Sequence, residues 1–288
     1  GEWGSALFDA LSAKNECVIT SRTPRQIPHF VSVSEALECE ALVFALAAQQ
    51  TAQWLDQNFT YKNQKILVAS KGIDVASGRF LNEIFEAYVA RGNLAYLSGP
   101  SFATEVMQKL PCALVVSSCN ENLAELFASV FPVYIKTYTS GDIIGAEVCG
   151  AYKNVIAIAS GVCDGLELGN NARASLIARG IVEIARFGKF FGAREETFLG
   201  LSGVGDLFLT ASSALSRNYR VGLGLARGKG LEEILRELGE VAEGVATTEA
   251  VVNIATKHKI YAPIATEVAQ ILRGKDVRAS LKDLLRKK

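Results

Sequence analysis

The pattern of apolar and polar positions changes near residue 138. Up to Tyr138, short apolar runs alternate with stretches of helical length, which is typical of buried parallel strands separated by helices. The predicted strands are CVIT at 17–20, LVFAL at 42–46, ILVA at 66–69, LAYL at 94–97, ALVVS at 113–117 and VYIK at 133–136. The first half of the chain is therefore predicted to be an α/β domain with a doubly wound parallel sheet.

Beyond Ser140, apolar residues recur at helical spacing instead. The set Leu231, Ile234, Leu235 and Leu238 follows the i, i+3, i+4, i+7 pattern of one helix face. The predicted helices cover 141–163, 171–191, 216–227, 231–238, 245–258, 263–273 and 277–287. We therefore expect two domains, an α/β domain over 1–138 and an all-α domain over 139–288.

Composition and charge narrow the class of protein. The 288 residues are 49% hydrophobic and 21% charged, which is a globular composition. With 30 basic and 30 acidic residues there is no net field to attract nucleic acid, so an anionic ligand needs a local cluster of cations. The longest apolar run, Ala41 to Ala48, is shorter than the ~20 residues that cross a bilayer. We expect a cytoplasmic protein with no integral membrane segment.

Cysteine and histidine provide little material for catalysis. The six cysteines are scattered without a CxxC pair, which is typical of buried thiols in a reducing compartment. The two histidines, His29 and His258, lie far apart, so neither a histidine metal site nor a Ser-His-Asp triad is expected. Lysines and carboxylates remain as the candidate catalytic groups.

The first residues resemble the second half of a GxGxxG turn. Gly1 and Gly4 precede a helical stretch, where a dinucleotide phosphate would meet the helix N-terminus; a plain helix start is the alternative. Arg22 follows the next predicted strand, at the position where an acid would bind a free ribose 2′-hydroxyl. An arginine there can pair with the 2′-phosphate of NADP instead, or can be a solvated loop residue.

Two further strand ends carry candidate binding groups. Lys71 follows ILVA, and the turn SGPSFA at 98–103 follows LAYL. Ligands of open α/β sheets bind at the carboxyl ends of strands, so both segments could meet a phosphate or a nicotinamide. A lysine after a strand is also commonly an ordinary surface residue.

Lys153 and Asn154 lie at the centre of an otherwise apolar helix, 147–161. Burial lowers the pKa of a lysine and a nearby carboxylate raises it, so the two together can poise Lys153 to exchange a proton near neutral pH. A snorkelling side chain or a structural ion pair is the alternative.

Asp206 and Thr210 are four residues apart, so they share a face of the helix that follows a glycine turn. Asp206 is a candidate partner for Lys153, although an N-cap is a common role for such an aspartate. Ser216, Arg217 and Asn218 stand at another helix start, where the guanidinium and backbone N–H groups could hold a phosphate. A capped helix with a solvated arginine is the alternative.

These segments together resemble the bacterial NAD(P)-dependent glycerol-3-phosphate dehydrogenase family along nearly the whole chain. The matching motifs are GxWG at 1–4, SKG at 70–72, SGPSFAxE at 98–105, ExCGAYKNVIAIxxG at 147–161, GLxGxGDLxLT at 200–210, SRN at 216–218 and VxEG at 241–244. The central motif and the GDLxLT segment are the most specific.

The resemblance implies a Rossmann-type domain followed by a helical domain, in a homodimer that interconverts glycerol 3-phosphate and dihydroxyacetone phosphate with NAD(P)H for glycerophospholipid synthesis. The implied catalytic residues are Lys153, Asp206, Lys71 and Thr210. The implied substrate-binding residues are Lys71, Gly99, Ser101, Lys153, Asn154, Asp206, Ser216, Arg217 and Asn218. The implied cofactor-binding residues are Gly1, Glu2, Trp3, Gly4, Arg22, Lys71, Gly99, Ser101, Ala103, Arg217, Val241 and Glu243.

Two features depart from the family pattern. The family has a strand and a further glycine before the position of Gly1, and more often a proline where this chain has Ala47 and Ala48.

Other functions remain open, namely another two-domain hydroxyacid or ketoacid dehydrogenase, or a non-catalytic sensor of nicotinamide nucleotides. The presence of Lys153, Asp206 and Thr210 together favours an enzyme, because a sensor needs no proton shuttle.

Overall fold

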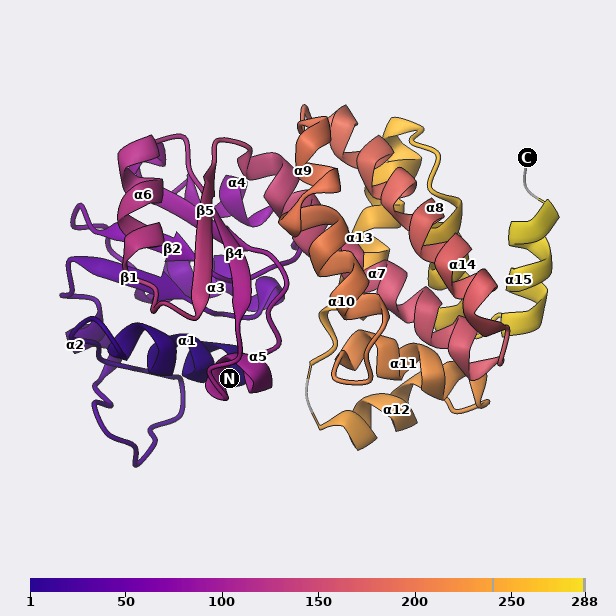
Figure 1. The fold of residues 1–288 in the computed structure, drawn as a ribbon, viewed down its shortest axis with the longest axis horizontal. Coiled ribbons are helices and arrows are strands. Elements are labelled where there is room, and N and C mark those ends of the chain that lie inside the picture. The colour runs from indigo at the N-terminus through magenta and orange to yellow at the C-terminus, as the bar shows by residue number, and fades with distance from the viewer. Residues whose placement is uncertain (240, 287–288) are drawn as a thin grey trace. The chain divides into compact units, whose positions relative to one another are not determined.

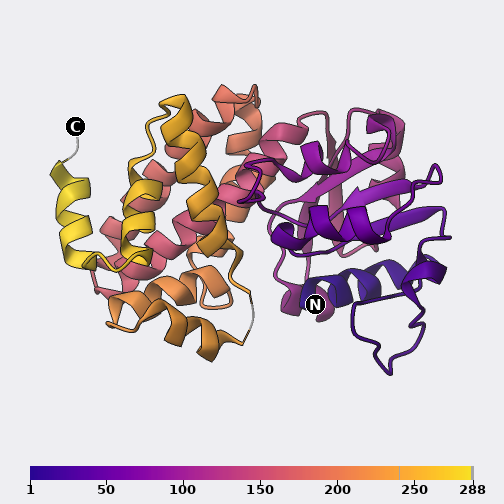
Figure 2. The same ribbon diagram turned by 180° about the vertical axis from the view of Figure 1, so that it is seen from behind.

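The computed structural model describes residues 1–239 and 241–286 of the chain. They form two compact units, which Figures 1 and 2 show from opposite sides. The first unit comprises residues 1–70 and 82–143, and the second comprises residues 71–81, 144–239 and 241–286. Residues 71–81 thus depart from the division at residue 138 that the sequence suggests.

The first unit alternates strands and helices, as expected of an α/β fold. Its elements are α1 (Glu2–Ser12), α2 (Val33–Ala36), β1 (Ala41–Phe44), α3 (Ala48–Asn58), β2 (Lys65–Val68), α4 (Leu81–Phe85), the 3₁₀ turn η1 (Arg91–Asn93), β3 (Leu94–Ser98), α5 (Ala103–Met107), β4 (Cys112–Ser117), α6 (Glu121–Ser129) and β5 (Ile135–Ser140). The sheet order is β1-β2-β3-β4-β5.

Apolar side chains pack on both faces of this sheet, although its edge strands β1 and β5 keep exposed positions. Leu67 and Leu97 contribute to an apolar core that also contains Leu7 of α1 and Phe127 of α6. On neighbouring strand positions, Phe44 packs edge-to-face against aromatic rings of the segments after it, Trp54, Phe59 and Phe85. Helices on both faces of a mainly parallel sheet make a doubly wound, Rossmann-like fold, so the predicted fold class is confirmed.

Three details of the predicted sheet were wrong. The pair β3–β4 is antiparallel, because the connection between these strands contains only the five-residue helix α5, whereas parallel crossovers usually need a longer helix. The run CVIT forms no strand of the sheet, and only Ile19 makes an isolated bridge, to Phe30. The last strand begins at Ile135, since Val133 lies fully exposed in the preceding turn.

The second unit is built from helices, as the change of periodicity predicts. Its elements are α7 (Ile143–Gly165), α8 (Gly169–Phe190), α9 (Glu195–Leu199), the π-helical turn η2 (Leu201–Gly205), α10 (Asp206–Ala211), α11 (Arg217–Ala226), α12 (Leu231–Leu238), α13 (Glu243–His258), α14 (Pro263–Leu272) and α15 (Val277–Arg286). Residues 287 and 288, part of the predicted last helix, lie outside the described residues.

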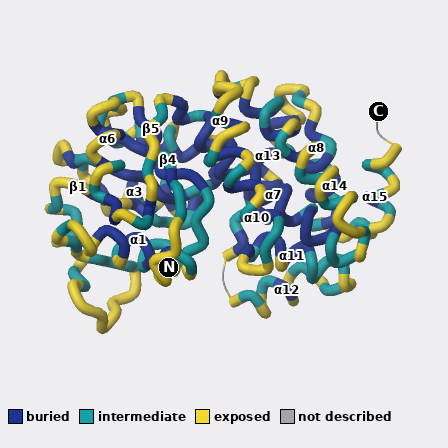
Figure 3. Tube along the Cα trace, in the orientation of Figure 1, coloured by how far each residue is buried: buried dark blue, intermediate teal, exposed yellow. Residues whose placement is uncertain are grey.

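Helix α7 is the centre of this unit. By length and composition it could cross a membrane, but most of it is buried among the other helices (Figure 3). Its backbone touches that of α11, since a Cβ on Gly161 would lie 2.0 Å from the Tyr219 carbonyl oxygen, and one on Gly222 would lie 2.0 Å from the Ile158 carbonyl oxygen. Glycine at both positions therefore fixes α11 directly against α7.

Candidate active site

A buried carboxylate with two lysines forms the centre of the candidate site in the helical unit. Lys153 of α7 donates to Asp206 Oδ1 and, over 3.0 Å, to Thr210 Oγ1. Thr210 in turn lies 3.4 Å from Asp206 Oδ1, because both residues are on one face of α10. One ammonium group is thus held by two oxygens from a single helix turn.

Lys71 completes the cluster from a distant part of the sequence. Its Nζ donates to Asp206 Oδ2 over 2.7 Å, so each carboxylate oxygen accepts from a different lysine. The path of the Lys71 side chain depends on Gly150 of α7, where an added Cβ would lie 3.2 Å from both Cγ and Cδ of Lys71. A glycine at position 150 therefore leaves the space through which Lys71 reaches the carboxylate.

The turn before α10 explains how Asp206 is placed. Residues Leu201–Gly205 form a single π-helical turn, a feature often found at functional sites. Gly203 is required within it, because a Cβ there would lie 2.1 Å from the Phe198 carbonyl oxygen. The turn delivers Asp206 to the start of α10 with only 1% of its surface exposed.

Burial and charge act against each other on these groups. The pKa of Lys153 is lowered to about 8: burial is the largest cause, the pairing with Asp206 opposes it, and the nearby positive charge of Lys71 adds to it. Burial alone would raise the pKa of Asp206, but the two lysines outweigh it and hold the pKa below its ordinary value. Lys153 can therefore hold or release a proton near neutral pH while Asp206 stays ionised.

A second group of candidates lies where three helices meet. Ser216 caps α11 by accepting from the Tyr219 backbone N–H, which leaves Arg217 partly exposed as the first helical residue. The Asn218 side-chain oxygen accepts from the backbone N–H of Gly244 in α13 over 2.9 Å. A Cβ on Gly244 would also lie 2.8 Å from the Asn154 carbonyl oxygen of α7, so this glycine lets α7, α11 and α13 meet closely.

The two remaining candidates of the helical unit lie just before and at the start of α13. Glu243 is the first residue of that helix and is partly buried, whereas the Val241 side chain is 58% exposed. Gly244 follows Glu243 directly, so the helix start that carries Glu243 is fixed by the contact between Gly244 and Asn218.

The cofactor candidates of the first unit begin at helix α1. Gly1 is its N-cap, Glu2 lies in its first turn, and within residues 1–239 and 241–286 no side chain caps that terminus. The indole nitrogen of Trp3 donates to the Ala69 carbonyl oxygen at the end of β2 over 3.0 Å. Gly4 faces Ala45, whose Cβ would be 3.5 Å from an added Cβ, so the helix start lies close to the segment that follows β1.

Arg22 and the turn after β3 provide the other candidates of this unit. Arg22 is exposed and donates to the Gln50 side chain over 3.0 Å. Gly99 has a φ of +108°, and an added Cβ would lie 3.0 Å from the Ala113 carbonyl oxygen, so only glycine fits. Ser101 Oγ donates to the Gly99 carbonyl oxygen, and Ala103 begins α5.

The structure thus brings Lys71, Lys153, Asp206 and Thr210 into direct contact, and gathers Asn154, Asn218 and Gly244 at a second point of the same unit. Sequence reasoning missed the role of Gly150, which is visible only once the path of Lys71 is known. It also missed Glu183 of α8, which accepts from the Tyr152 hydroxyl and from two backbone N–H groups at the start of α14.

Both parts of the chain match models of one protein family. Residues 15–124 match the family model described as NAD-dependent glycerol-3-phosphate dehydrogenase N-terminus, and residues 142–282 match its C-terminal counterpart. The glycerol-3-phosphate dehydrogenase [NAD(P)+] of Campylobacter lari is 62% identical over 288 residues, which cover 100% of this chain and 96% of that protein. The enzyme of the same name from Sulfurimonas denitrificans is 61% identical over 285 residues, covering 99% and 96%.

Solved structures resemble the fold as well. The crystal structure of glycerol-3-phosphate dehydrogenase from Coxiella burnetii has a TM-score of 0.86 and 30% sequence identity, and the match covers 100% of this chain and 97% of that one. The glycerol-3-phosphate dehydrogenase of Saccharomyces cerevisiae has a TM-score of 0.76 at 27% identity, with coverages of 90% and 80%.

Proposed function

Because the chain belongs to the NAD(P)-dependent glycerol-3-phosphate dehydrogenase family, we propose that Lys153 is the proton donor and acceptor in the interconversion of glycerol 3-phosphate and dihydroxyacetone phosphate. The observation that carries this assignment is the buried contact of Lys153 with Asp206 and Thr210. The protein is an NAD(P)-dependent oxidoreductase of this class, which is consistent with a role in glycerophospholipid synthesis.

The residues of the first unit fit a dinucleotide. The first turn of α1 has no side-chain cap, so its backbone N–H groups suit the pyrophosphate. Arg22 is exposed and suits a 2′-phosphate, and the turn Gly99–Ala103 would lie near the nicotinamide. Trp3 and Gly4 complete the set on α1, and Val241, Glu243 and Arg217 are the proposed cofactor contacts of the helical unit.

Bound NADH or NADPH supplies the hydride, and the oxidised nucleotide accepts it in the reverse direction. In the reduction, Lys153 gives a proton from Nζ to the carbonyl oxygen of dihydroxyacetone phosphate as that oxygen gains negative charge. Asp206 and Thr210 orient the ammonium group, and Lys71 adds a second positive charge beside it. In the oxidation, neutral Lys153 takes the proton from the hydroxyl group of glycerol 3-phosphate.

The phosphate of the substrate needs a separate cationic contact. Arg217, at the start of α11, offers a bidentate fork, and the helix terminus behind it adds backbone N–H groups. Ser216, Asn218 and Asn154 hold this part of the unit in place. Binding at the phosphate, away from the reacting carbon, orients the carbonyl toward Lys153.

The test is the oxidation of NADPH and NADH with dihydroxyacetone phosphate, comparing the wild type with Lys153→Ala. We expect turnover to fall by about 100-fold or more, the usual effect of losing a general acid. Lys71 still neutralises Asp206 in this variant, so the circular dichroism spectrum should stay unchanged. Exposed Lys189→Ala is the matched control. Near-normal turnover of Lys153→Ala would refute the assignment.

A second substrate in the same assay tests the alternative that the protein is a hydroxyacid or ketoacid dehydrogenase. A 2-keto acid of similar size carries a carboxylate in place of the phosphate, and we expect it to be a poor substrate because Arg217 and the α11 terminus suit a phosphate group. A keto acid reduced as fast as dihydroxyacetone phosphate would identify a different substrate class.

We further propose a homodimer that works in the cytoplasm. The family resemblance supports the dimer, and the free cysteines among the described residues fit a reducing compartment. Sedimentation velocity of the purified protein measures the assembly, and a monomer at all concentrations would refute the dimer.

A further inference from the structure

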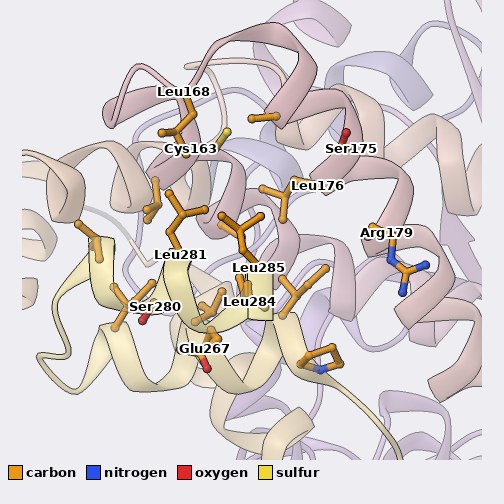
Figure 4. A pocket seen from close by; sticks show the side chains of 18 of the residues that line it. Cys163, Leu168, Ser175, Leu176, Arg179, Glu267, Ser280, Leu281, Leu284 and Leu285 are labelled. Carbon is orange, nitrogen blue, oxygen red and sulfur yellow. The ribbon is translucent and has the colours of Figure 1, made fainter. Parts of the chain in front are cut away.

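A cavity of about 480 Å³ lies in the helical unit (Figure 4), and its lining includes none of Lys71, Lys153, Asp206 and Thr210. It is bounded by the C-terminal half of α7 and by α8, α14 and α15. Its lining includes Leu168, Leu176, Leu281, Leu284 and Leu285, and Figure 4 shows the labelled leucine side chains gathered around one space. A cavity of this size and lining is large enough for a small organic ligand.

Ion pairs of Lys275 fix helix α15, which forms one wall of the cavity, against α14. Lys275, in the turn before α15, donates to Glu267 of α14 over 2.7 Å and to Asp283 of α15 over 2.7 Å. It also donates to Gln270 of α14 over 2.8 Å. One ammonium group thus ties α15 to α14, so the leucines of α15 are held over the cavity.

Among the described residues, one polar group of the lining has no hydrogen-bond partner and one cation has no ion pair. The Ser280 side chain is 1% exposed, and its hydroxyl has no hydrogen-bond partner among the described residues. A buried hydroxyl without a partner is costly, so its position on the cavity wall favours a ligand that offers a polar atom. Arg179 of α8 lies at the edge of the lining, exposed and without an ion pair in the described part of the chain.

The charge of the surrounding helices selects the kind of ligand. On α8, Arg173 pairs with Asp164 and Lys189 pairs with Glu195, whereas Arg179 is exposed without an ion pair in the described part of the chain; α15 carries Arg278, Lys282 and Arg286 against Asp283. An anion would be attracted to Arg179 at the edge of the cavity.

We propose that this cavity binds an aliphatic chain with an anionic head group, with the chain among the leucines and the head group at Arg179. The chain displaces water from apolar walls, which is favourable at about 25 cal/mol per Å² of buried apolar surface. The head group pairs with Arg179. The shared chemistry is that of a fatty carboxylate or an alkyl phosphate.

Isothermal titration calorimetry of the full chain with decanoate and with decyl phosphate tests the proposal and distinguishes the two head groups. We expect saturable binding of one molecule per chain, with butanoate and decyltrimethylammonium at least ten-fold weaker. Tighter binding of either anion supports the site and identifies its head group. Equal binding of decanoate and decyltrimethylammonium would overturn the proposal, and so would the absence of binding by both decyl anions.

Variants on one helix locate the binding. Ser175→Trp places a large side chain in the lining from an exposed position, and we expect it to weaken decanoate at least ten-fold; the neighbouring Ala174→Trp lies outside the lining and should bind as the wild type does. Arg179→Gln should weaken decanoate about five-fold but leave decanol unchanged, as suits one exposed ion pair. Lys189→Gln removes a charge from the same helix and should have no effect.

Two results would place the binding elsewhere. Equal losses with both tryptophan variants would show that the probe does not enter this cavity. A dimer that Ser175→Trp dissociates in sedimentation would show that a second copy covers this face. The readout is direct binding, so failure of the proposed dehydrogenase assignment would leave this test unaffected.

Discussion

Replacing Asp206 by asparagine tests the electrostatic reading of the lysine cluster. The change keeps the shape of the side chain and one hydrogen-bond acceptor, but it removes the negative charge that both Lys153 and Lys71 contact. Two buried or partly buried ammonium groups then face each other without compensation. Burial and mutual repulsion both act to lower the pKa of Lys153, and the opposing effect of the carboxylate is gone.

The distance between the Lys71 ammonium group and the Asp206 carboxylate gives the scale of such a charge interaction. At 2.7 Å, the Nζ to Oδ2 distance of Lys71, one charge pair is worth about 6 kcal/mol at an effective dielectric constant of about 20. That corresponds to roughly 4 pKa units at about 1.4 kcal/mol per unit. Water entry and side-chain relaxation reduce it, so we expect the pKa of Lys153 to fall by about 1 to 4 units.

The sign of the pH dependence follows from the role of Lys153. Reduction of dihydroxyacetone phosphate needs the protonated ammonium group, so in the wild type kcat/KM should fall as the pH rises through about 8. In Asp206→Asn the fall should occur at lower pH, and the rate at pH 7 should drop by about two-fold for a shift of about 1 unit and by several hundred-fold for a shift of about 4 units. In the oxidation direction the neutral amine is the active form, so the rate should rise through the same pH.

The assay is kcat/KM for the reduction between pH 5.5 and 9.5, with circular dichroism to verify folding at each pH. Asp164→Asn is the matched control, because Asp164 also accepts from a cation, Arg173, and from the Tyr219 hydroxyl, but lies outside the Lys153 cluster. It should leave the midpoint near pH 8. A midpoint in Asp206→Asn that is unchanged or shifted to higher pH would refute the reasoning.

Four other substitutions have defined expected outcomes. Arg217→Ala should raise the KM for dihydroxyacetone phosphate by an amount equivalent to about 2 to 5 kcal/mol if the guanidinium holds a desolvated phosphate; an unchanged KM in steady-state kinetics would contradict this. Arg22→Asp should shift the preference for NADPH over NADH toward NADH by about ten-fold, and the preference of the wild type should shrink with added salt; the ratio of kcat/KM for the two nucleotides at two salt concentrations measures both effects. Gly150→Ala should lower kcat more than it raises KM, because the added methyl group displaces the Lys71 side chain from its path; equal kcat in the variant would show that Lys71 has room to adjust. Gly161→Ala should destabilise the protein by about 3 kcal/mol or more in urea unfolding, since the new Cβ would overlap the α11 backbone, and a wild-type midpoint would disprove the close helix contact.

The local signals of the sequence account for most of the helical unit. Helical spacing from residue 141 onward predicts α7, α8 and α11 to α15 because each of them buries one apolar face or is buried throughout. The strand predicted at 17–20 was wrong, because its residues lack the burial and pairing that a strand needs. Its β-branched residues satisfy the local preference for a strand, but Val18 is exposed and, among the described residues, Ile19 makes only an isolated bridge to Phe30 instead of a ladder.

The chemistry of the site could be read from the chain only in part. Lys153 is conspicuous because it interrupts an apolar helix, and Asp206 and Thr210 are paired by their spacing. The contact of Lys71 with Asp206 joins residues 135 positions apart, and no local rule predicts such a pairing. Gly150 is equally invisible, since its importance depends on a neighbour that only the folded chain brings near.

The excursion of residues 71–81 into the helical unit has a consequence for dissecting this protein. Ile73 and Phe80 of that segment are fully buried in the helical core, and Lys71 belongs to its charged cluster. A fragment that starts at residue 144 would lack all three, and a fragment that ends at 143 would expose two large apolar side chains. Domain swaps, split-protein designs or isolated expression of the helical half should therefore carry this eleven-residue piece along, either by circular permutation or as an added peptide that restores the cluster on binding.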